Sequence, residues 1–427
     1  MKVYINENQY LSDVLPVIPS NTVLCKKITG CGATRGEIKA NRHSIIIEPN
    51  VPVIKGKCSK HGEDNLFGVH EGVYTTHVVA YLRQSVKANK LFKILATPES
   101  FQKVKEAFDI LGVNMHEECF LLFDECHKIV KDVDYREDIT LPFDDFFQFK
   151  NKALVSATPV EFSDPRFKSF EVVEIVPTYD VRKTLHICPT NNVLEATKKV
   201  IEHVGCGKIC FFINSTDVID SMMNALGIKE ESTVFCAPKS VERLNEKGFM
   251  NARDNWSEDS MKRYNFFTSR FFCALDIEME ERPHVIMVTD LSHATHSMLD
   301  PRTDVWQIAG RFRNGISGIY HVTSFNSNYT VQSVADLKEQ VSMMENVYNY
   351  LLNQYNHASS RNARIVYMDT LKSHPYKKFL DKEDRKNWSV IDNHVDEGLV
   401  TSMYNSEKEL LGGYERVGLY KVVPVKG

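Results

Sequence analysis

The amino-acid sequence predicts an α/β protein in which parallel sheets are flanked by helices. Short apolar runs alternate with amphipathic stretches along most of the chain, as expected for parallel strands joined by covering helices. The alternation restarts near residue 180, so we expect domains at 1–180 and 181–328. From Val334 to Tyr355, apolar residues recur every three or four positions, which predicts a long helix in a mostly helical C-terminal extension, 329–427.

In the first domain, apolar runs and amphipathic stretches predict strands and helices in alternation. Two segments lack either pattern. Lys55–Gly72 is rich in Lys, Gly and His and predicts an exposed loop, with phosphate contacts by its lysines as the alternative. Asp164–Thr178 predicts a crossover and linker. The expected strands are Thr22–Ile28, Ser44–Glu48, Phe92–Ala96, Phe120–Phe123 and Ala153–Ser156, and the expected helices include Tyr74–Lys90 and Ser100–Leu111.

The second domain repeats the alternation. Its two expected helices flank the strand Ile209–Ile213, and Gly227 is the predicted stop of the second. The helices are Val193–Val204 and Asp217–Leu226, and the strands are Lys183–Ile187, Ile209–Ile213, Thr233–Cys236, Tyr264–Thr268, His284–Thr289 and Gly318–Val322.

The composition is that of a globular protein and excludes few functions. Of 427 residues, 43% are hydrophobic and 25% are charged, so disorder is not indicated. The net charge of −4 gives no global basic surface, which argues against a passive, charge-driven binder of nucleic acid. The sequence has no N-terminal apolar signal region and no long apolar run. We therefore expect a cytoplasmic protein without a membrane partner.

Two carboxylates stand directly behind one predicted strand. The run Cys119–Phe123 is apolar on both faces and should lie centrally in the sheet, with Asp124 and Glu125 at its C-terminal tip. Ligands bind at such strand tips in open parallel sheets. The first acid is placed to hold magnesium, and the second to orient or deprotonate a water that attacks a phosphate. Acids at the end of a strand can also cap the helix that follows, so other motifs are needed to distinguish a catalytic role from a capping role.

Further polar groups follow later strands in a definite order. Asp124–His127 is Asp-Glu-Cys-His, Ala153–Pro159 ends in Ser-Ala-Thr-Pro, and Gln307–Arg313 is Gln-Ile-Ala-Gly-Arg-Phe-Arg. In this order they resemble motifs II, III and VI of the superfamily 2 helicases, specifically the DExH group. The resemblance implies two RecA-like domains with ATP in the cleft between them.

Other motifs of that family are similar to further segments, so the resemblance extends over about residues 20–325. It implies nucleic-acid contacts at Pro49, Thr97, Asn214 and Thr268. The similar segments are Ile28–Thr34 (motif I), Ser44–Asn50 (Ia), Ile94–Glu99 (Ib), Lys208–Ser215 (IV), and Phe267–Arg270 with Ala274–Asp276 (V).

The chain departs from the family most clearly in the phosphate-binding loop. A loop of this class reads Gly-x-Gly-Lys-Thr, and Ala33 stands where the lysine belongs. Gly30, Gly32 and Thr34 are retained. Arg35 is the predicted replacement for the missing charge, with Lys27 as the alternate. Motif V has Ala274 in place of the usual glycine, and in motif VI Arg313 comes one position before the expected second arginine, where Asn314 stands.

The resemblance assigns a role to each matched residue. Gly30, Gly32 and Arg35 would bind the phosphates of ATP, and Thr34 with Asp124 would hold Mg²⁺. In the catalytic set, Glu125 would position water, while motif VI would reach across from the second domain. His127, Ser156 and Thr158 would couple the nucleotide state to the position of the domains. The catalytic set comprises Asp124, Glu125, Gln307, Arg311 and Arg313.

The sequence is therefore compatible with two functions. The first is an ATP-dependent helicase or translocase acting on DNA or RNA. The second is a degenerate, non-hydrolysing helicase-like protein that binds nucleic acid or a protein partner, for which the C-terminal extension is a candidate surface. Ala33 favours the second, and the retained acids and motif VI residues favour the first. The altered loop also resembles divergent helicase-like proteins of phages and mobile elements, which implies a bacterial host cytoplasm.

Overall fold

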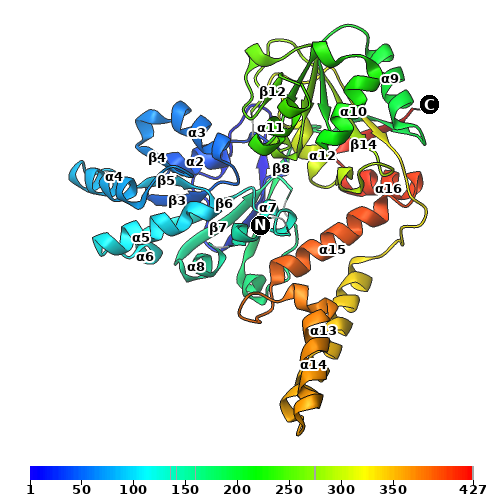
Figure 1. The fold of residues 1–427 in the computed structure, drawn as a ribbon. Coiled ribbons are helices and arrows are strands. Elements are labelled where there is room, and N and C mark those ends of the chain that lie inside the picture. Colours follow the sequence, from blue (N-terminus) through cyan, green and yellow to red (C-terminus); the bar gives the residue numbers. More distant parts are fainter. Residues whose placement is uncertain (135, 141, 159, 274–275, 426–427) are drawn as a thin grey trace.

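The computed structural model describes residues 1–134, 136–140, 142–158, 160–273 and 276–425. Its strands form two eight-stranded parallel sheets flanked by helices (Figure 1). The predicted fold class is confirmed: two RecA-like α/β domains with parallel sheets, followed by a mostly helical C-terminal extension. Pro159 of the Ser-Ala-Thr-Pro segment, and Ala274 and Leu275 of the motif V segment, lie outside the described residues.

The first sheet has the strand order β1-β8-β2-β7-β6-β3-β5-β4. Every residue of β6 is buried, as its apolar sequence predicts for a central strand. Its strands are β1 (Lys2–Ile5), β2 (Thr22–Cys25), β3 (His43–Ile47), β4 (Leu66–Val69), β5 (Lys93–Ala96), β6 (Cys119–Asp124), β7 (Asn151–Ser156) and β8 (Glu171–Pro177). Its helices are α1 (Leu11–Val14), α2 (Ala33–Lys39), α3 (Val51–Lys60), α4 (Thr75–Lys87), α5 (Phe101–Leu111), α6 (Met115–Glu118), α7 (His127–Lys131) and α8 (Phe143–Gln148).

This strand order gathers the motifs of the first domain. The strands β2, β7, β6 and β3 are consecutive neighbours, and all of their pairings are parallel. Their carboxyl ends therefore meet at one edge of the sheet, where the chain continues into motifs I, III, II and Ia. The fold thus brings together segments that are far apart in the sequence.

The predicted exposed loop at Lys55–Gly72 is wrong. Helix α3 continues to Lys60, and β4 pairs in parallel with β5. Pro52 lies in the first turn of α3, where a missing N–H costs nothing, and Val53 and Ile54 bury one face of the helix. The sequence concealed this helix because only its first turn is apolar, while the rest carries lysine, glycine and serine.

The predicted crossover at Asp164–Thr178 is also wrong in part, because Glu171–Pro177 forms β8 between β1 and β2. Val173 and Ile175 are fully buried, whereas Val172 is exposed. The strand pairs with segments more than a hundred residues earlier in the chain. Its stability therefore depends on partners that a local pattern does not reveal.

The second sheet has the order β12-β11-β13-β10-β14-β15-β9-β16. The chain enters it between Pro177 and Lys183. Helix α9 occupies its predicted range, and α10 begins one residue early, after the N-cap Ser215. The strands are β9 (Lys183–Pro189), β10 (Ile209–Phe212), β11 (Ser232–Phe235), β12 (Ala252–Arg253), β13 (Tyr264–Phe267), β14 (His284–Thr289), β15 (Gly318–Thr323) and β16 (Tyr420–Pro424), and the helices are α9 (Val193–Val204), α10 (Thr216–Leu226), α11 (Pro238–Glu246) and α12 (Asp304–Ala309).

The C-terminal extension contacts both domains. Its helices α13 and α14 lie side by side and project from the rest of the molecule (Figure 1), while α15 packs on α7 of the first domain. The strand β16 pairs with β9, so the extension also completes the second sheet. The helices are α13 (Val334–His357), α14 (Arg361–Ser373), α15 (Trp388–Met403) and α16 (Glu407–Val417).

Among the helices of the described residues, none has the length and apolar character needed to cross a bilayer.

Candidate nucleotide-binding cleft

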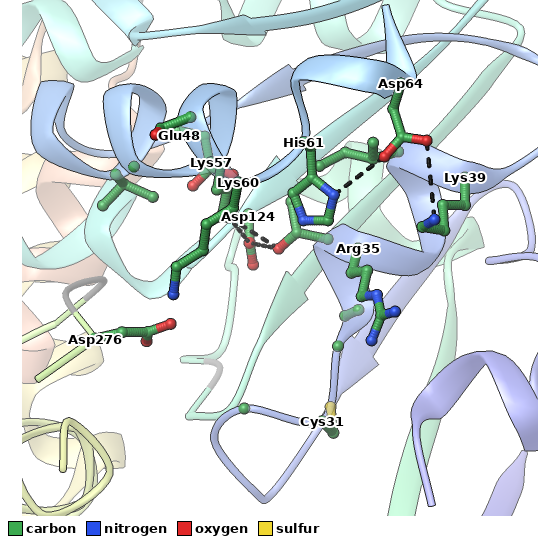
Figure 2. Close-up of a pocket in the computed structure, with 18 of the residues that line it drawn as sticks. Cys31, Arg35, Lys39, Glu48, Lys57, Lys60, His61, Asp64, Asp124 and Asp276 are labelled. Atoms are coloured by element: carbon green, nitrogen blue, oxygen red, sulfur yellow. Dashed lines mark hydrogen bonds and ion pairs between the residues drawn. The ribbon is translucent and has the colours of Figure 1, made fainter. Parts of the chain in front are cut away.

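A cleft opens where the carboxyl edge of the first sheet faces the residues that follow α12 in the second domain. It encloses about 920 Å³, which is within the range of small-molecule sites. The loop Gly30–Thr34, the acids Asp124 and Glu125, and one side of α3 line it from the first domain, and Arg311 and Arg313 line it from the second. Figure 2 shows part of this lining.

Glycine is required at two positions of the loop. Gly30 has φ +74° and Gly32 has φ +83°, a left-handed conformation that side chains with a Cβ rarely adopt. Gly32 directly precedes α2, so the loop ends at the N-terminus of a helix. Such turns direct successive N–H groups toward one point and favour anions. Ala33, the first residue of α2, is only 3% exposed.

Glycines also allow the two domains to approach closely. A Cβ on Gly30 would overlap with the Arg313 guanidinium, and one on Gly310 would overlap with the Thr29 side chain. The Trp306 indole Nε1 donates to the carbonyl of Lys27 at 3.0 Å. The loop of motif I is therefore in direct contact with the segment of motif VI.

Asp124 accepts hydrogen bonds or ion pairs from three side chains. The Thr34 hydroxyl donates to Oδ2, Lys57 Nζ lies 3.3 Å from the same oxygen, and Lys26 Nζ lies 3.3 Å from Oδ1. Burial opposes ionisation, but the two ammonium groups outweigh it and hold the pKa of Asp124 well below its usual range. The carboxylate is therefore ionised, as a metal ligand must be.

The donor set fits magnesium. Mg²⁺ prefers hard oxygen ligands and retains several waters, so one carboxylate and one hydroxyl suffice beside phosphate oxygens. Asp124 and Thr34 supply these two oxygens side by side. Within the described residues, His, Cys, Asp and Glu side chains form no larger group suited to a metal.

Glu125 lies at the junction of the two domains. Gln307 Nε2 donates to its Oε2 at 3.0 Å, and Arg311 Nη2 donates to Gln307 Oε1 at 2.8 Å. Glu125 and Arg311 are 8% and 3% exposed. Burial opposes ionisation of Glu125, but Lys26 outweighs it and lowers the pKa below the usual value. Its backbone φ of +50° is unusual for a residue other than glycine and is typical of strained functional sites.

The three predicted coupling residues form a buried chain behind Glu125. His127 Nδ1 lies 2.9 Å from Ser156 Oγ, and the same hydroxyl accepts the backbone N–H of Thr158 at 3.1 Å. Gln307 Nε2 reaches the Thr158 hydroxyl at 3.4 Å. Burial lowers the pKa of His127 to about 4, so the ring is neutral near pH 7 and serves as a hydrogen-bonding group.

The residues nominated for the missing loop lysine take other partners. Lys27 Nζ pairs with Glu174 at 3.3 Å, on β8, and does not line the cleft. The Arg35 guanidinium lies over the Tyr10 ring at 4.9 Å and points away from Asp124 (Figure 2). Arg313 is engaged with Asp276, to which its Nε donates at 2.9 Å.

The lysines that approach Asp124 are Lys26 and Lys57. From the sequence, Lys26 had no expected role, and Lys57 was considered only as one of several lysines that could contact phosphates. Lys26 precedes the motif I segment, and Lys57 belongs to the stretch expected to be a loop. The excess of lysine just after motif Ia was the only sequence signal for Lys57. Its place beside Asp124 depends on the turn from β3 into α3, which the sequence did not reveal.

The four residues nominated for nucleic-acid contact follow strand ends in both domains. Pro49, Thr97 and Thr268 are buried, and Asn214 donates to the carbonyl of His296 at 3.2 Å. Their side chains present little free surface. Contacts at these positions would therefore be made mainly by the backbone or by neighbouring side chains.

Comparison with known proteins gives similarity in fold only. No family model and no curated protein matches the sequence. Among solved structures, S. cerevisiae Dbp5 bound to RNA and ADP BeF3 is similar at 11% identity and a TM-score of 0.45, over 90% of this chain and 91% of that one. A DEAD box protein from the hyperthermophile Methanococcus jannaschii is similar at 13% identity and a TM-score of 0.34, over 71% of this chain and 82% of that one. At these values, function must be argued from the residues of the cleft.

Proposed function

We propose that this chain is an ATP-dependent helicase or translocase of the DExH type, which couples ATP hydrolysis in the cleft to movement on DNA or RNA. The observation that carries the proposal is the hydrogen bond from Gln307 Nε2 to Glu125 Oε2 at 3.0 Å. It joins the second domain to the acid suited to act on the attacking water. Arg311 is held by the same glutamine, so charge stabilisation is complete only when the two domains meet.

Each group in the cleft has a distinct role in this proposal. The N–H groups of Gly30–Thr34 bind the phosphates of ATP, and Thr34 and Asp124 hold Mg²⁺, which neutralises phosphate charge when bound. Glu125 orients the water and accepts its proton. Its pKa lies below the usual value, so it is ionised at neutral pH.

Movement would follow from opening and closing of the cleft. The chain His127–Ser156–Thr158 ends at Gln307 of the second domain, and it would transmit the state of the nucleotide to the domain contact. Nucleic acid would bind across both domains through phosphate contacts. Its affinity should fall with salt and vary little with sequence.

One observation favours a second function, a non-hydrolysing protein that binds nucleic acid or a protein partner. Ala33 is buried where the family's phosphate-directed lysine belongs, and Arg35 points away from Asp124. A chain without that charge would retain the fold and lose turnover. The two functions differ in a single measurable property, hydrolysis.

ATP hydrolysis with and without single-stranded and duplex DNA and RNA tests the proposal. We expect nucleic acid to stimulate turnover, and Glu125→Gln to lower it about a hundredfold or more, because the amide cannot accept a proton. Glu161→Gln, at an acid whose side chain is 88% exposed, is the matched control and should hydrolyse at the wild-type rate. Nucleic-acid binding without hydrolysis by the wild type would instead support the second function.

A further inference from the structure

The phosphate-binding loop lacks its lysine, yet two ammonium groups from other elements flank the acid next to it. Lys26 Nζ lies against Asp124 Oδ1, and Lys57 Nζ lies against Asp124 Oδ2. Both lysines line the cleft. Positive charge is therefore present beside the loop, although it does not come from the position of Ala33.

Lys57 occupies the meeting point of the loop and the acids. Its ammonium donates to the Thr34 hydroxyl at 3.0 Å, lies 3.3 Å from Asp124 Oδ2, and forms a close ion pair with Glu48 (Figure 2). Thr34 immediately follows Ala33, so this ammonium lies next to the residue that lacks a charge. Its side chain is one quarter exposed, which leaves it access to the cleft.

Lys26 differs from Lys57 in its surroundings. It is held between Asp124 Oδ1 and Glu125 Oε1, at 3.3 Å from each, and its side chain is only 7% exposed. Removing its charge would take away the cation that contacts both buried carboxylates and leave Lys57 beside Asp124 only. Lys26 therefore neutralises the acid pair and is the less mobile of the two.

We propose that Lys57 of α3 supplies the phosphate-directed positive charge that the loop lacks at Ala33. The inference rests on the proposed binding of ATP in this cleft. It adds that the charge comes from a different element than in the family's loop, so the phosphates are held between α2 and α3.

Glu48 gives Lys57 an anchor that is independent of the metal ligands. The oxygens of Thr34 and Asp124 that Lys57 contacts are also those suited to Mg²⁺. When a cation takes these oxygens, Glu48 still holds the ammonium at the edge of the cleft, where phosphate becomes its second partner. Lys57 bonds to Glu48 Oε1, and the other oxygen, Oε2, is buried and has no hydrogen-bond partner among the residues that the structure describes.

Equilibrium binding of fluorescent ATP and ADP analogues with Mg²⁺, alongside turnover, tests the role of Lys57. Lys57→Met keeps the length of the side chain and removes the charge. We expect it to weaken ATP binding about tenfold to a hundredfold and ADP binding about threefold or less, because the proposed partner of the ammonium is the terminal phosphate, which ADP lacks. A merely structural lysine would change the affinity for both nucleotides equally.

Two further variants complete the design. Lys55→Met changes an exposed lysine on the same helix that does not line the cleft, and it should bind both nucleotides as the wild type does. Ala33→Lys should restore ATP affinity in the Lys57→Met background and add little in the wild type, because one ammonium then replaces the other. Thermal melting identifies any variant that has lost its fold.

The outcomes separate this inference from the proposed function. If the wild type binds ATP while Lys57→Met retains its preference for ATP over ADP, Lys57 does not have this role and the proposed function stands. The same holds if Lys26→Met removes ATP binding and Lys57→Met does not. If the folded wild type binds no nucleotide, both the proposed function and the role of Lys57 are wrong.

Discussion

Two regions join the domains, and they use opposite chemistry. At the cleft, the contact consists of hydrogen bonds around Gln307 and a close approach at Gly310. Beneath it, a cluster of charges joins three parts of the chain: Lys131 of the first domain, Asp300 and Arg302 of the second, and Asp396 of the C-terminal extension. Lys131 Nζ lies 2.5 Å from Asp300 and 2.8 Å from Asp396, and Arg302 donates to both acids at 2.7–2.9 Å.

Because of this difference, the contact at the cleft is suited to opening, whereas the charge cluster is suited to holding the two domains together. At the cleft, the neutral side chains of Gln307 and Trp306 donate across the domain contact, and water can take their place when the cleft opens. Separating Lys131 from Asp300, which is 1% exposed, would remove one of the two cations that pair with this buried carboxylate. The extension, through α15, therefore ties the domains together through residues that do not line the cleft.

The largest expected effect is on the charge cluster. Lys131→Met leaves Asp300 and Asp396 with Arg302 alone, so we expect the free energy of unfolding to fall by about 3 kcal/mol or more. Denaturant unfolding measures it. Lys168→Met, at an exposed lysine of the same domain, should change the stability by less than about 0.5 kcal/mol. If Lys131→Met and Lys168→Met lowered the free energy of unfolding equally, the charge cluster would not hold the domains together.

A smaller effect is expected at the close approach in the cleft. The Cβ of Gly310→Ala would overlap with Thr29 and should cost about 1–3 kcal/mol of overpacking. Thr29→Gly in the same chain removes the overlapping atoms and should recover most of that loss. A double-mutant cycle of unfolding free energies measures the coupling. A coupling near zero would mean that the domains do not meet at this point.

The cleft contact was predictable from sequence, and the charge cluster was not. Asp124, Glu125, Gln307 and Arg311 lie in segments that resemble motifs of a known family, where phosphate chemistry restricts which residue types serve. The structure places Asp124, Glu125 and Arg311 in the lining of one cleft and joins Gln307 to Glu125 by a hydrogen bond. Lys131, Asp300 and Asp396 follow no pattern. They are ordinary charged residues whose meeting depends on how α15 packs on α7.

The same distinction holds within the fold and the loop. Strands with strong apolar runs, such as β6 and β14, were found within a residue of their ends. Strands whose stability depends on distant partners, such as β1, β8 and β16, were not predicted. The sequence pointed to Arg35 and Lys27 as replacements for the loop lysine, because both lie near Ala33 in the chain. Lys57 is far from Ala33 in the chain and lies beside the loop only in space, where α3 positions it.

The remaining expected effect is small at neutral pH and grows as the pH falls, and it separates the two regions. His127, behind the cleft contact, has its pKa lowered to about 4 by burial, against an ordinary value of 6.5. Below pH 6.5, His127 binds a proton in the unfolded chain but stays neutral in the folded chain until the pH approaches 4. His127 should therefore reduce the free energy of unfolding by about 1.4 kcal/mol per pH unit between pH 6.5 and 4.

The charge cluster responds in a lower range of pH. Burial opposes ionisation of Asp300, but Lys131 and Arg302 outweigh it and hold its pKa well below 3.8, so its contribution is lost only as the pH falls below that value. His127→Asn keeps a hydrogen-bonding group toward Ser156 and removes the titration. Its unfolding free energy should therefore fall less steeply than that of the wild type between pH 6.5 and 4, and in parallel with it below pH 4. If the unfolding free energies of the variant and the wild type ran in parallel over the whole pH range, His127 would bind its proton equally well in the folded and unfolded states. The two regions would then not differ in their response to pH.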